Sequence, residues 1–338
     1  YGDHRDLHSF PTDALPIYYR FAWEGKSFSI GVSIGLVPVT ESDRDMGRIL
    51  SAADTACYAA KEGGRNRVHL YRPDDDQLAE RHGQMQWVAR LHSALDEDRL
   101  RLYVQPIVPL TPGEAVHFEI LVRLEEDGRL ISPGSFIPAA ERYNLMPRID
   151  EWVFRNVLAW VGDTYRKEGR VEGTWCINLS GNSLSDERLL ADIRAGLERA
   201  ALPPGAICLE ITESSAVANL SRVVSFIAEV KQLGCAFALD DFGSGLSSFA
   251  YLKTLPVDYL KIDGSFVRDI ATDPTDRAMV QAIHTIGHTM GLATIAEFVE
   301  DEAILEVLRE IGVDYAQGFH VGVPRPLAEM GKVRMMPR

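Results

Sequence analysis

One pattern repeats from about residue 85 to residue 330. A short apolar run ends in one or two polar residues, and a stretch with apolar positions at helical spacing follows. Strands and helices that alternate in this way are typical of a parallel α/β architecture, and eight units in this length fit a (β/α)8 TIM-type barrel better than an open sheet. The eight apolar runs are residues 102–105, 116–119, 175–178, 207–210, 237–241, 259–261, 294–297 and 315–317.

The chain before the barrel has a different pattern. A strand-like alternation at 29–36, helical spacing from Met46 to Ala60 and a short strand at 68–71 predict a β-α-β unit, which is too small to bury a core of its own. The residues before this unit show neither period, so we expect them to be non-native or disordered. The predicted organisation is a lead (1–18), the β-α-β unit (19–72), a helical linker (73–84), the barrel domain (85–330) and a tail (331–338).

Composition adds a cellular setting to this picture. Apolar residues make up 46% of the 338 positions and charged residues 25%, as in ordinary soluble proteins. No apolar run approaches the ~18 residues that a membrane helix needs, so we expect no membrane insertion of this fragment and a cytoplasmic location, although a longer natural protein could be anchored through a missing N-terminal region. The four cysteines lie far apart and are expected to be reduced.

The charge restricts the possible ligands. The chain has 49 acidic residues against 35 Lys and Arg, a formal net charge of −14. This excess argues against a nucleic-acid polymer as partner, because such proteins neutralise phosphates with basic side chains. An anionic ligand would need cations held by clustered carboxylates.

The polar residues that close the apolar runs supply such a cluster. The carboxyl ends of barrel strands form the catalytic face of this fold, so these side chains should converge there. A single carboxylate at such a place is more often a helix cap or an ion pair, but several carboxylates at close quarters need protons or cations. Oxygen donors without Cys or His favour Mg²⁺ or Mn²⁺ over zinc. The residues concerned are Glu119, Asn178, Glu210, Asp240, Lys261, Glu297 and Gln317.

Short motifs in this region resemble those of the EAL-domain cyclic di-GMP phosphodiesterases. The segment EILVR at 119–123 is similar to the EAL signature, with Ile120 in place of Ala. Phe298 stands where the family usually has Gly, which adds bulk beside Glu297. The other motifs are QPI (105–107), NLS (178–180), EITES (210–214), DDFGSGLSSFAYLKTLPVDYLKID (240–263), AEFVE (296–300) and AQGFHVGVP (316–324).

The resemblance implies a two-metal hydrolysis of cyclic di-GMP to linear pGpG, with Mg²⁺ or Mn²⁺, and a homodimer. It implies one metal on Glu119, Asn178, Glu210 and Asp240, and a second on Asp241 and Glu297, with Asp240 between the two. It implies catalytic roles for Lys261, Glu297, Asp241 and Glu119, substrate contacts from Gln105, Leu121, Arg123 and Gln317, and a loop-stabilising role for Glu213. Five formal negative charges would then be balanced by two divalent cations and Lys261.

Alternatives remain open at this point. Lys261 could pair with Asp263, and Arg123 with Glu125 or Glu126, in purely structural ion pairs. The barrel could also be a catalytically inactive receptor for cyclic di-GMP, or an interaction scaffold without chemistry. The intact set of strand-end residues favours the enzyme.

The N-terminal unit carries a second resemblance. SIGVSIG (29–35) and AADTACYAAKEGGRNRV (52–68) look like the C-terminal half of a GGDEF (diguanylate cyclase) domain. The half with the cyclase signature is absent, so the resemblance implies no cyclase activity here.

Overall fold

The computed structural model divides the chain into two compact units, which we describe separately. The first covers Tyr1–Ala89 and the second Arg90–Arg338. The structure describes residues 18–23, 26–39, 46–62, 67–71, 87–243 and 251–332. The predicted linker, residues 1–17 of the predicted lead and most of the predicted tail lie outside these ranges.

The first unit contains the predicted β-α-β piece, but the strand predicted at 29–36 is divided, since residues 29–31 belong to β2 (Lys26–Gly31) and only 34–36 form β3. Strands β3 (Ile34–Leu36) and β4 (Val68–Leu70) pair in parallel, and helix α1 (Met46–Glu62) connects them. A Cβ atom at Gly35 would collide with the backbone of α1, so this glycine permits the close packing of helix on strand. The remaining strands of the unit, β1 (Tyr18–Trp23) and β2 (Lys26–Gly31), form an antiparallel pair.

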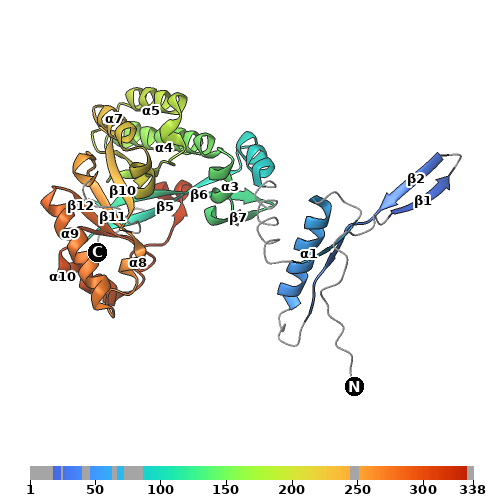
Figure 1. The fold of residues 1–338 in the computed structure, drawn as a ribbon. Coiled ribbons are helices and arrows are strands. Elements are labelled where there is room, and N and C mark those ends of the chain that lie inside the picture. The colour runs from blue at the N-terminus through green and yellow to red at the C-terminus, as the bar shows by residue number, and fades with distance from the viewer. Residues whose placement is uncertain are drawn as a thin grey trace, which may run out of the picture. The chain divides into compact units, whose positions relative to one another are not determined.

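All eight predicted strands are present in the second unit. They close into a barrel because β5 pairs with both β6 and β13 (Figure 1). The prediction of an all-parallel barrel is wrong for β5, which runs antiparallel to both neighbours. Residues 110–116 join β5 to β6 without the crossover helix that a parallel pair requires. The barrel strands are β5 (Leu100–Pro109), β6 (His117–Glu126), β8 (Trp175–Asn178), β9 (Ile207–Thr212), β10 (Ala236–Phe242), β11 (Tyr259–Ile262), β12 (Ala293–Ala296) and β13 (Tyr315–Ala316).

Helices cover the outside of this barrel (Figure 1). The side chains of Asp186, Asp273 and Asp301 accept backbone N–H groups and cap α5, α9 and α10, respectively. Helices α7, α9 and α10 lie where apolar positions recur at helical spacing after the strands, at 223–233, 277–290 and 302–311. The helices include α3 (Ile137–Arg142), α4 (Met146–Glu168), α5 (Glu187–Ala200), α6 (Glu213–Ala218), α7 (Leu220–Lys231), α8 (Gly264–Val267), α9 (Pro274–Thr289) and α10 (Glu302–Ile311), and edge strands β7 (Arg129–Ile131) and β14 (Arg325–Pro326) complete the sheet.

Apolar side chains fill the barrel interior. Ile107, Cys176, Cys208, Ala238, Ile295 and Tyr315 form one buried cluster contributed by six strands. All four cysteines are free, as the sequence predicts. Among the described residues, no helix is both long enough and apolar enough to cross a bilayer. Because apolar side chains fill its interior, the barrel is a packed core, and a catalytic or binding site must lie at one of its ends.

The first testable prediction concerns a histidine in this core. His117 is 6% exposed, its Nδ1 accepts the N–H of Thr174, and its Nε2 has no partner among the described residues. Burial lowers the pKa of His117 to about 4, from 6.5 in the unfolded chain. The unfolded chain therefore binds more protons between these values, and the free energy of unfolding falls as pH falls from 6.5 to 4, by at most about 3 kcal/mol from this residue.

We expect His117→Phe to flatten this part of the pH profile, measured by urea unfolding at several pH values. Any loss of stability from the unpaired Thr174 N–H would shift the whole profile without changing its slope. An unchanged slope between pH 6.5 and 4 would show that the lowered pKa of His117 does not cause this loss of stability.

Candidate active site

A buried lysine lies at the centre of the polar residues that the barrel strands bring together. Lys261 on β11 is fully buried, with its Nζ 2.9 Å from Glu297, 3.0 Å from Glu210, 3.1 Å from Asp240 and 3.7 Å from Glu119. Burial by itself lowers the pKa of Lys261, but the surrounding carboxylates outweigh it and raise the pKa well above its usual value. The lysine is therefore a fixed positive charge inside an acidic cluster.

The alternative partner of Lys261 is ruled out. The carboxylate of Asp263 instead caps α8, where it accepts the N–H of Ser265 at 2.7 Å. Lys261 thus belongs to the strand-end cluster and not to a local ion pair.

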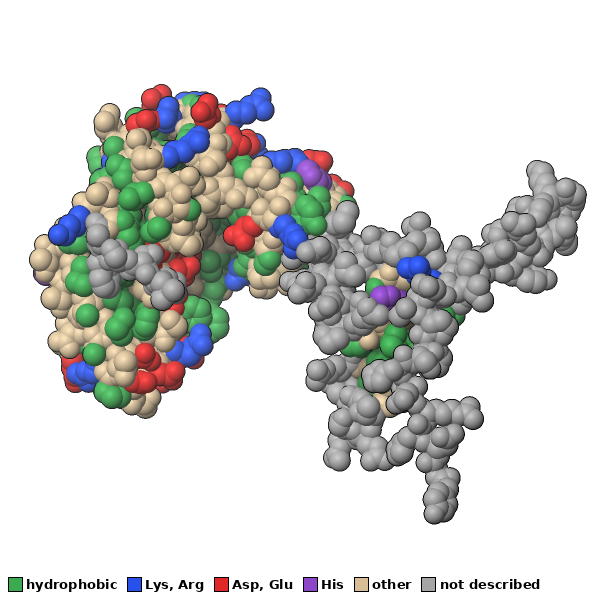
Figure 2. Space-filling model, in the orientation of Figure 1, with side chains coloured by type: hydrophobic (Ala, Val, Ile, Leu, Met, Phe, Trp, Pro, Cys, Tyr) green, Lys and Arg blue, Asp and Glu red, His purple; other side chains and the backbone are tan. Residues whose placement is uncertain are grey.

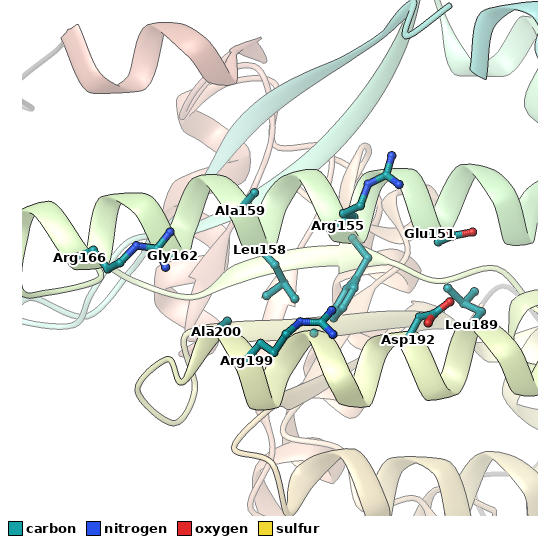
Figure 3. A pocket seen from close by; sticks show the side chains of 12 residues that line it. Glu151, Arg155, Leu158, Ala159, Gly162, Arg166, Leu189, Asp192, Arg199 and Ala200 are labelled. Atoms are coloured by element: carbon teal, nitrogen blue, oxygen red, sulfur yellow. The ribbon is translucent and has the colours of Figure 1, made fainter. Parts of the chain in front are cut away.

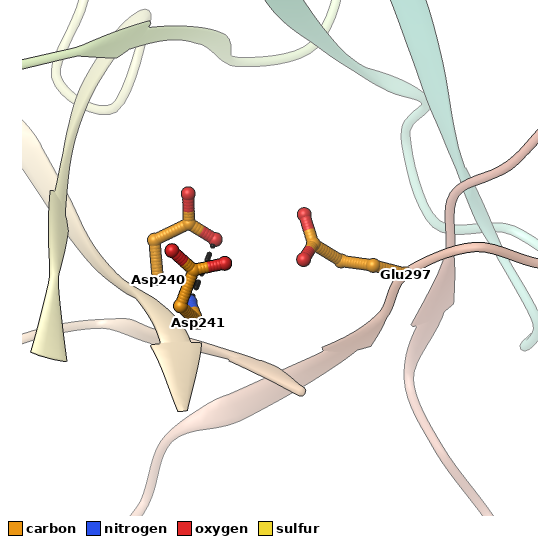
Figure 4. Close-up of side chains that lie close together, drawn as sticks. All are labelled: Asp240, Asp241 and Glu297. Carbon is orange, nitrogen blue, oxygen red and sulfur yellow. Dashed lines mark hydrogen bonds between the residues drawn. The ribbon is translucent and has the colours of Figure 1, made fainter. Parts of the chain in front are cut away.

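A local irregularity of β10 brings two consecutive aspartates into the cluster. Successive residues of a regular strand point to opposite faces, so Asp240 and Asp241 should diverge. The register of β10 with β11 shifts between Leu239 and Phe242, and Asp241 has φ 55°, in the left-handed region. The Asp241 N–H also donates to Asp240 Oδ1 at 3.0 Å (Figure 4). Both carboxylates therefore face the site.

These two aspartates and Glu297 form a group that could hold a metal ion. One carboxylate oxygen from each of the three lies within 4.8 Å of the others, and Figure 4 shows Glu297 reaching toward the aspartates from the far side of the site. Burial and the neighbouring Asp240 raise the pKa of Asp241 to about 6, and burial raises that of Glu297 to about 8. Burial also raises the pKa of Glu210 well above its usual range. Without a cation, the cluster therefore tends to retain protons.

Two buried oxygen atoms in and around this group could accept a cation. Asn178 Nδ2 donates to Glu119 Oε1 at 2.7 Å, and Gln317 Nε2 donates to Glu119 Oε2 and to Gln105 Oε1. The buried Oε1 atoms of Glu210 and Gln317 have no hydrogen-bond donor among the described residues. Buried acceptors without donors, in a set free of Cys and His, fit a hard cation such as Mg²⁺ or Mn²⁺.

A cavity of about 360 Å³ opens beside the cluster, and Figure 2 shows acidic side chains in the hollowed face of this unit. Arg123, which lines it, donates to the Val122 carbonyl at 2.8 Å, and its guanidinium carbon lies 5.6 Å from the centre of the Tyr103 ring. The surface pairs considered for Arg123 are not formed, since Glu125 pairs with Arg101 and Glu126 with Arg90 and Arg99. Lining residues include Gln105, Glu119, Leu121, Arg123, Asp241 and Gln317.

A second cavity, of about 350 Å³, lies on the outer side of the barrel between α4 and α5 (Figure 3). Its lining includes Arg155, Arg166 and Arg199 together with Leu158 and Gly196. None of the strand-end polar residues lines it. The two cavities are similar in size, so the chemistry of the lining and not the volume identifies the candidate active site.

Glu213 lies beside the cluster and ties together the two described ends of the segment after β10. Its carboxylate accepts the Gly243 N–H at 2.9 Å and the Tyr251 hydroxyl at 2.6 Å. Burial and, to a lesser extent, this hydrogen bond raise the pKa of Tyr251 above its usual value. The sequence did not single out Tyr251, because its partner is 38 residues away.

Removing the Glu213 carboxylate is expected to lower activity without abolishing it. Glu213→Ala leaves the Gly243 N–H and the Tyr251 hydroxyl without this acceptor. The backbone that follows Asp240 and Asp241 is then held less firmly in place. We expect kcat to fall by about tenfold or more. Tyr251→Phe keeps the ring and should cost less, and equal losses in both variants would contradict the central role of the carboxylate.

One expectation about strand ends is wrong. Glu119 does not close its strand, because β6 continues to Glu126, where it pairs with β7. Gln105 likewise lies in the middle of β5, directly opposite Glu119 in the register. The antiparallel direction of β5 allows this pair to meet inside the site.

Comparison with known proteins gives a family for this arrangement. The sequence model of the EAL domain matches residues 88–324. The cyclic di-GMP phosphodiesterase PdeB of Shewanella oneidensis is 40% identical over 302 residues, which are 89% of this chain and 35% of that protein. The cyclic di-GMP phosphodiesterase PdeF of Escherichia coli is 33% identical, over 92% of this chain and 41% of that protein. The chain therefore spans less than half the length of these relatives.

Solved structures agree with this assignment. A structure described as the PaMucR phosphodiesterase in complex with c-di-GMP is 35% identical and superposes with a TM-score of 0.68, over 72% of this chain and 99% of that one. The FimX EAL domain of Pseudomonas aeruginosa bound to c-di-GMP is 30% identical with a TM-score of 0.65, over 70% of this chain and 96% of that one. The match is thus to the barrel unit.

Proposed function

This chain belongs to the EAL domain family, and from that premise we propose that it is a metal-dependent phosphodiesterase that hydrolyses cyclic di-GMP to linear pGpG. The observation that carries the proposal is the fully buried Lys261 among four carboxylates beside the cavity. The names of PdeB and PdeF, and the c-di-GMP bound to related barrels, support the choice of substrate.

The metal ligands are part of the proposal. Glu119, Asn178, Glu210 and Asp240 would hold one Mg²⁺ or Mn²⁺, and Asp241 and Glu297 would join Asp240 in holding a second. The raised pKa values of Asp241 and Glu297 and the unpaired Glu210 Oε1 support this choice of ligands. Such cations would lower the pKa of bound water and stabilise the charge that develops on the phosphodiester.

The remaining residues would bind and orient the reactants. Lys261 supplies a positive charge that holds the attacking water and offsets phosphate charge, since its ammonium is kept protonated by the carboxylates around it. Gln317 and Gln105 fix the orientation of Glu119 through their shared hydrogen bonds. Arg123 and Leu121, which line the cavity, would contact the nucleotide. Glu213 would steady the backbone next to Asp241.

Turnover with a product assay tests the proposal. Purified protein, cyclic di-GMP and Mg²⁺ or Mn²⁺ should give pGpG, detected by chromatography. Binding of cyclic di-GMP without product would instead identify a receptor, and neither binding nor product would favour an interaction scaffold.

Three finer features are proposed together with the activity. The choice between Mg²⁺ and Mn²⁺ can be tested by measuring turnover with each ion after chelation. A homodimer can be tested by sedimentation of the full chain. The N-terminal unit is proposed to derive from the C-terminal half of a GGDEF domain, which the parallel β3–β4 pair with its connecting helix supports.

A further inference from the structure

Phe298 is an aromatic residue next to the strand-end cluster around Lys261. It directly follows Glu297, and it lines the same cavity as Glu119 and Asp241. The side chain is 49% exposed, whereas Phe136 and Phe242 in the same unit are 0% and 1% exposed. Phe298 is therefore not held in place as a core residue.

The backbone of Phe298 is strained. Its φ is 55°, in the left-handed region that a bulky residue enters only at a cost. A glycine would adopt this conformation without penalty. Strained residues of this kind cluster at ligand sites, where the surrounding structure holds them. An exposed, strained aromatic residue that contributes little to the core calls for a role at the surface of the cavity.

Two neighbours fix the position of the ring. A Cβ atom on Gly264 would collide with the ring, so the glycine at the start of α8 gives Phe298 its place. The guanidinium carbon of Arg268 lies 5.1 Å from the ring centre. These contacts restrict the ring while about half of the side chain stays accessible.

The cavity adds other apolar surface around this ring. Leu121 and Phe319 line it as well, and Phe319 is 67% exposed. The same lining includes the carboxylates Glu119, Asp241 and Glu297, which suit the metal-bound phosphodiester of the substrate and not its bases. The cavity therefore combines acidic side chains with apolar, aromatic ones.

We propose that Phe298 is a substrate-binding residue that stacks against one purine base of the cyclic dinucleotide, an inference that rests on the proposed function. A base offers a flat π-face to an aromatic ring, and stacking of this kind needs no hydrogen-bond partner. The phosphodiester at the carboxylates and the base on Phe298 then occupy the same cavity. The ring strengthens substrate binding and takes no part in the chemical step.

Three substitutions separate stacking from backbone effects. Phe298→Gly removes the ring at a position whose φ suits glycine, so no backbone strain is added. Phe298→Trp keeps a stacking surface, and Phe298→Leu keeps apolar bulk without a ring. Met279→Ala, on the exposed face of α9, is a control for loss of exposed apolar surface elsewhere.

We expect Phe298→Gly to raise KM for cyclic di-GMP about tenfold while kcat changes less than threefold. Phe298→Trp should restore KM, Phe298→Leu should not, and Met279→Ala should match the unmodified protein. A cyclic dinucleotide with one guanine replaced by 2-aminopurine adds a direct readout, because stacking on the ring should quench its fluorescence in the unmodified protein and not in Phe298→Gly.

The outcomes distinguish this inference from the proposed function. If the unmodified protein makes pGpG but Phe298→Gly keeps the same KM and the same quenching, the stacking role is overturned and the activity stands. If no pGpG forms but Phe298→Gly weakens binding of cyclic di-GMP and relieves the quenching, the activity is overturned and the stacking role stands. A fall in kcat with unchanged KM would make Phe298 a positioning residue for Glu297 and also overturn the inference.

Discussion

Lys261→Met is expected to lower kcat by about 10³-fold while the barrel still folds. The substitution keeps the length and most of the volume of the side chain but removes the buried positive charge from the acidic cluster. A positioned group that handles a proton or charge of the reaction contributes 10²–10⁴-fold. Rates of pGpG formation at saturating substrate measure the loss, and circular dichroism checks the fold.

The same substitution has a second expected consequence. Without the lysine, the carboxylates of Glu210 and Glu297 lose their shared counter-charge, so their raised pKa values should rise further. More protons must then be released before a metal ion binds, and the pH at which added Mn²⁺ stabilises the protein should move upward. Lys167→Met, on the exposed end of α4, is the matched control and should change neither quantity. A kcat for Lys261→Met within threefold of the original would remove Lys261 from the mechanism.

The strands of the barrel could be predicted from the sequence because their signal is local. Each apolar run, such as 175–178 or 259–261, has its own length and ending, and the structure places a strand at each of the eight. The direction of β5 could not be predicted in this way. Direction depends on whether the connection crosses over the sheet, and the segment 110–116 has no pattern that reveals this.

The candidate active site could likewise be predicted only in part. Residue types and motif order were enough to name the side chains that meet around Lys261, but not to explain how Asp241 reaches them. A regular strand would turn Asp241 away from Asp240, and only the shift of register with the left-handed φ brings it back. Phe298 is a similar case, since its departure from the motif was visible while its strained backbone and exposed ring were not. Such features arise from tertiary contacts that no local pattern encodes.

Divalent metal is expected to stabilise this protein as well as to support turnover. An ion at about 100 times its Kd adds about 2.7 kcal/mol to the free energy of unfolding, which raises the Tm of a domain of this size by about 5–10 °C. The rise should grow from pH 6 to pH 8, because Asp241, with a pKa of about 6, and Glu297, with a pKa of about 8, must release their protons to bind the ion. Differential scanning calorimetry with Mn²⁺ and with EDTA measures both effects.

Asp240→Asn links this stabilisation to the cluster. The substitution removes one carboxylate from the group with Asp241 and Glu297, so the metal-dependent rise in Tm should be lost and pGpG formation should fall to the level seen in EDTA. The Tm without metal should change by only a few degrees, because relief of repulsion between carboxylates offsets the lost pairing with Lys261. Asp192→Asn, on the exposed side of α5, should keep the full metal-dependent rise. If Mn²⁺ stabilises Asp240→Asn as much as the original protein, the ion binds elsewhere, and the metal site proposed at these strand ends is wrong.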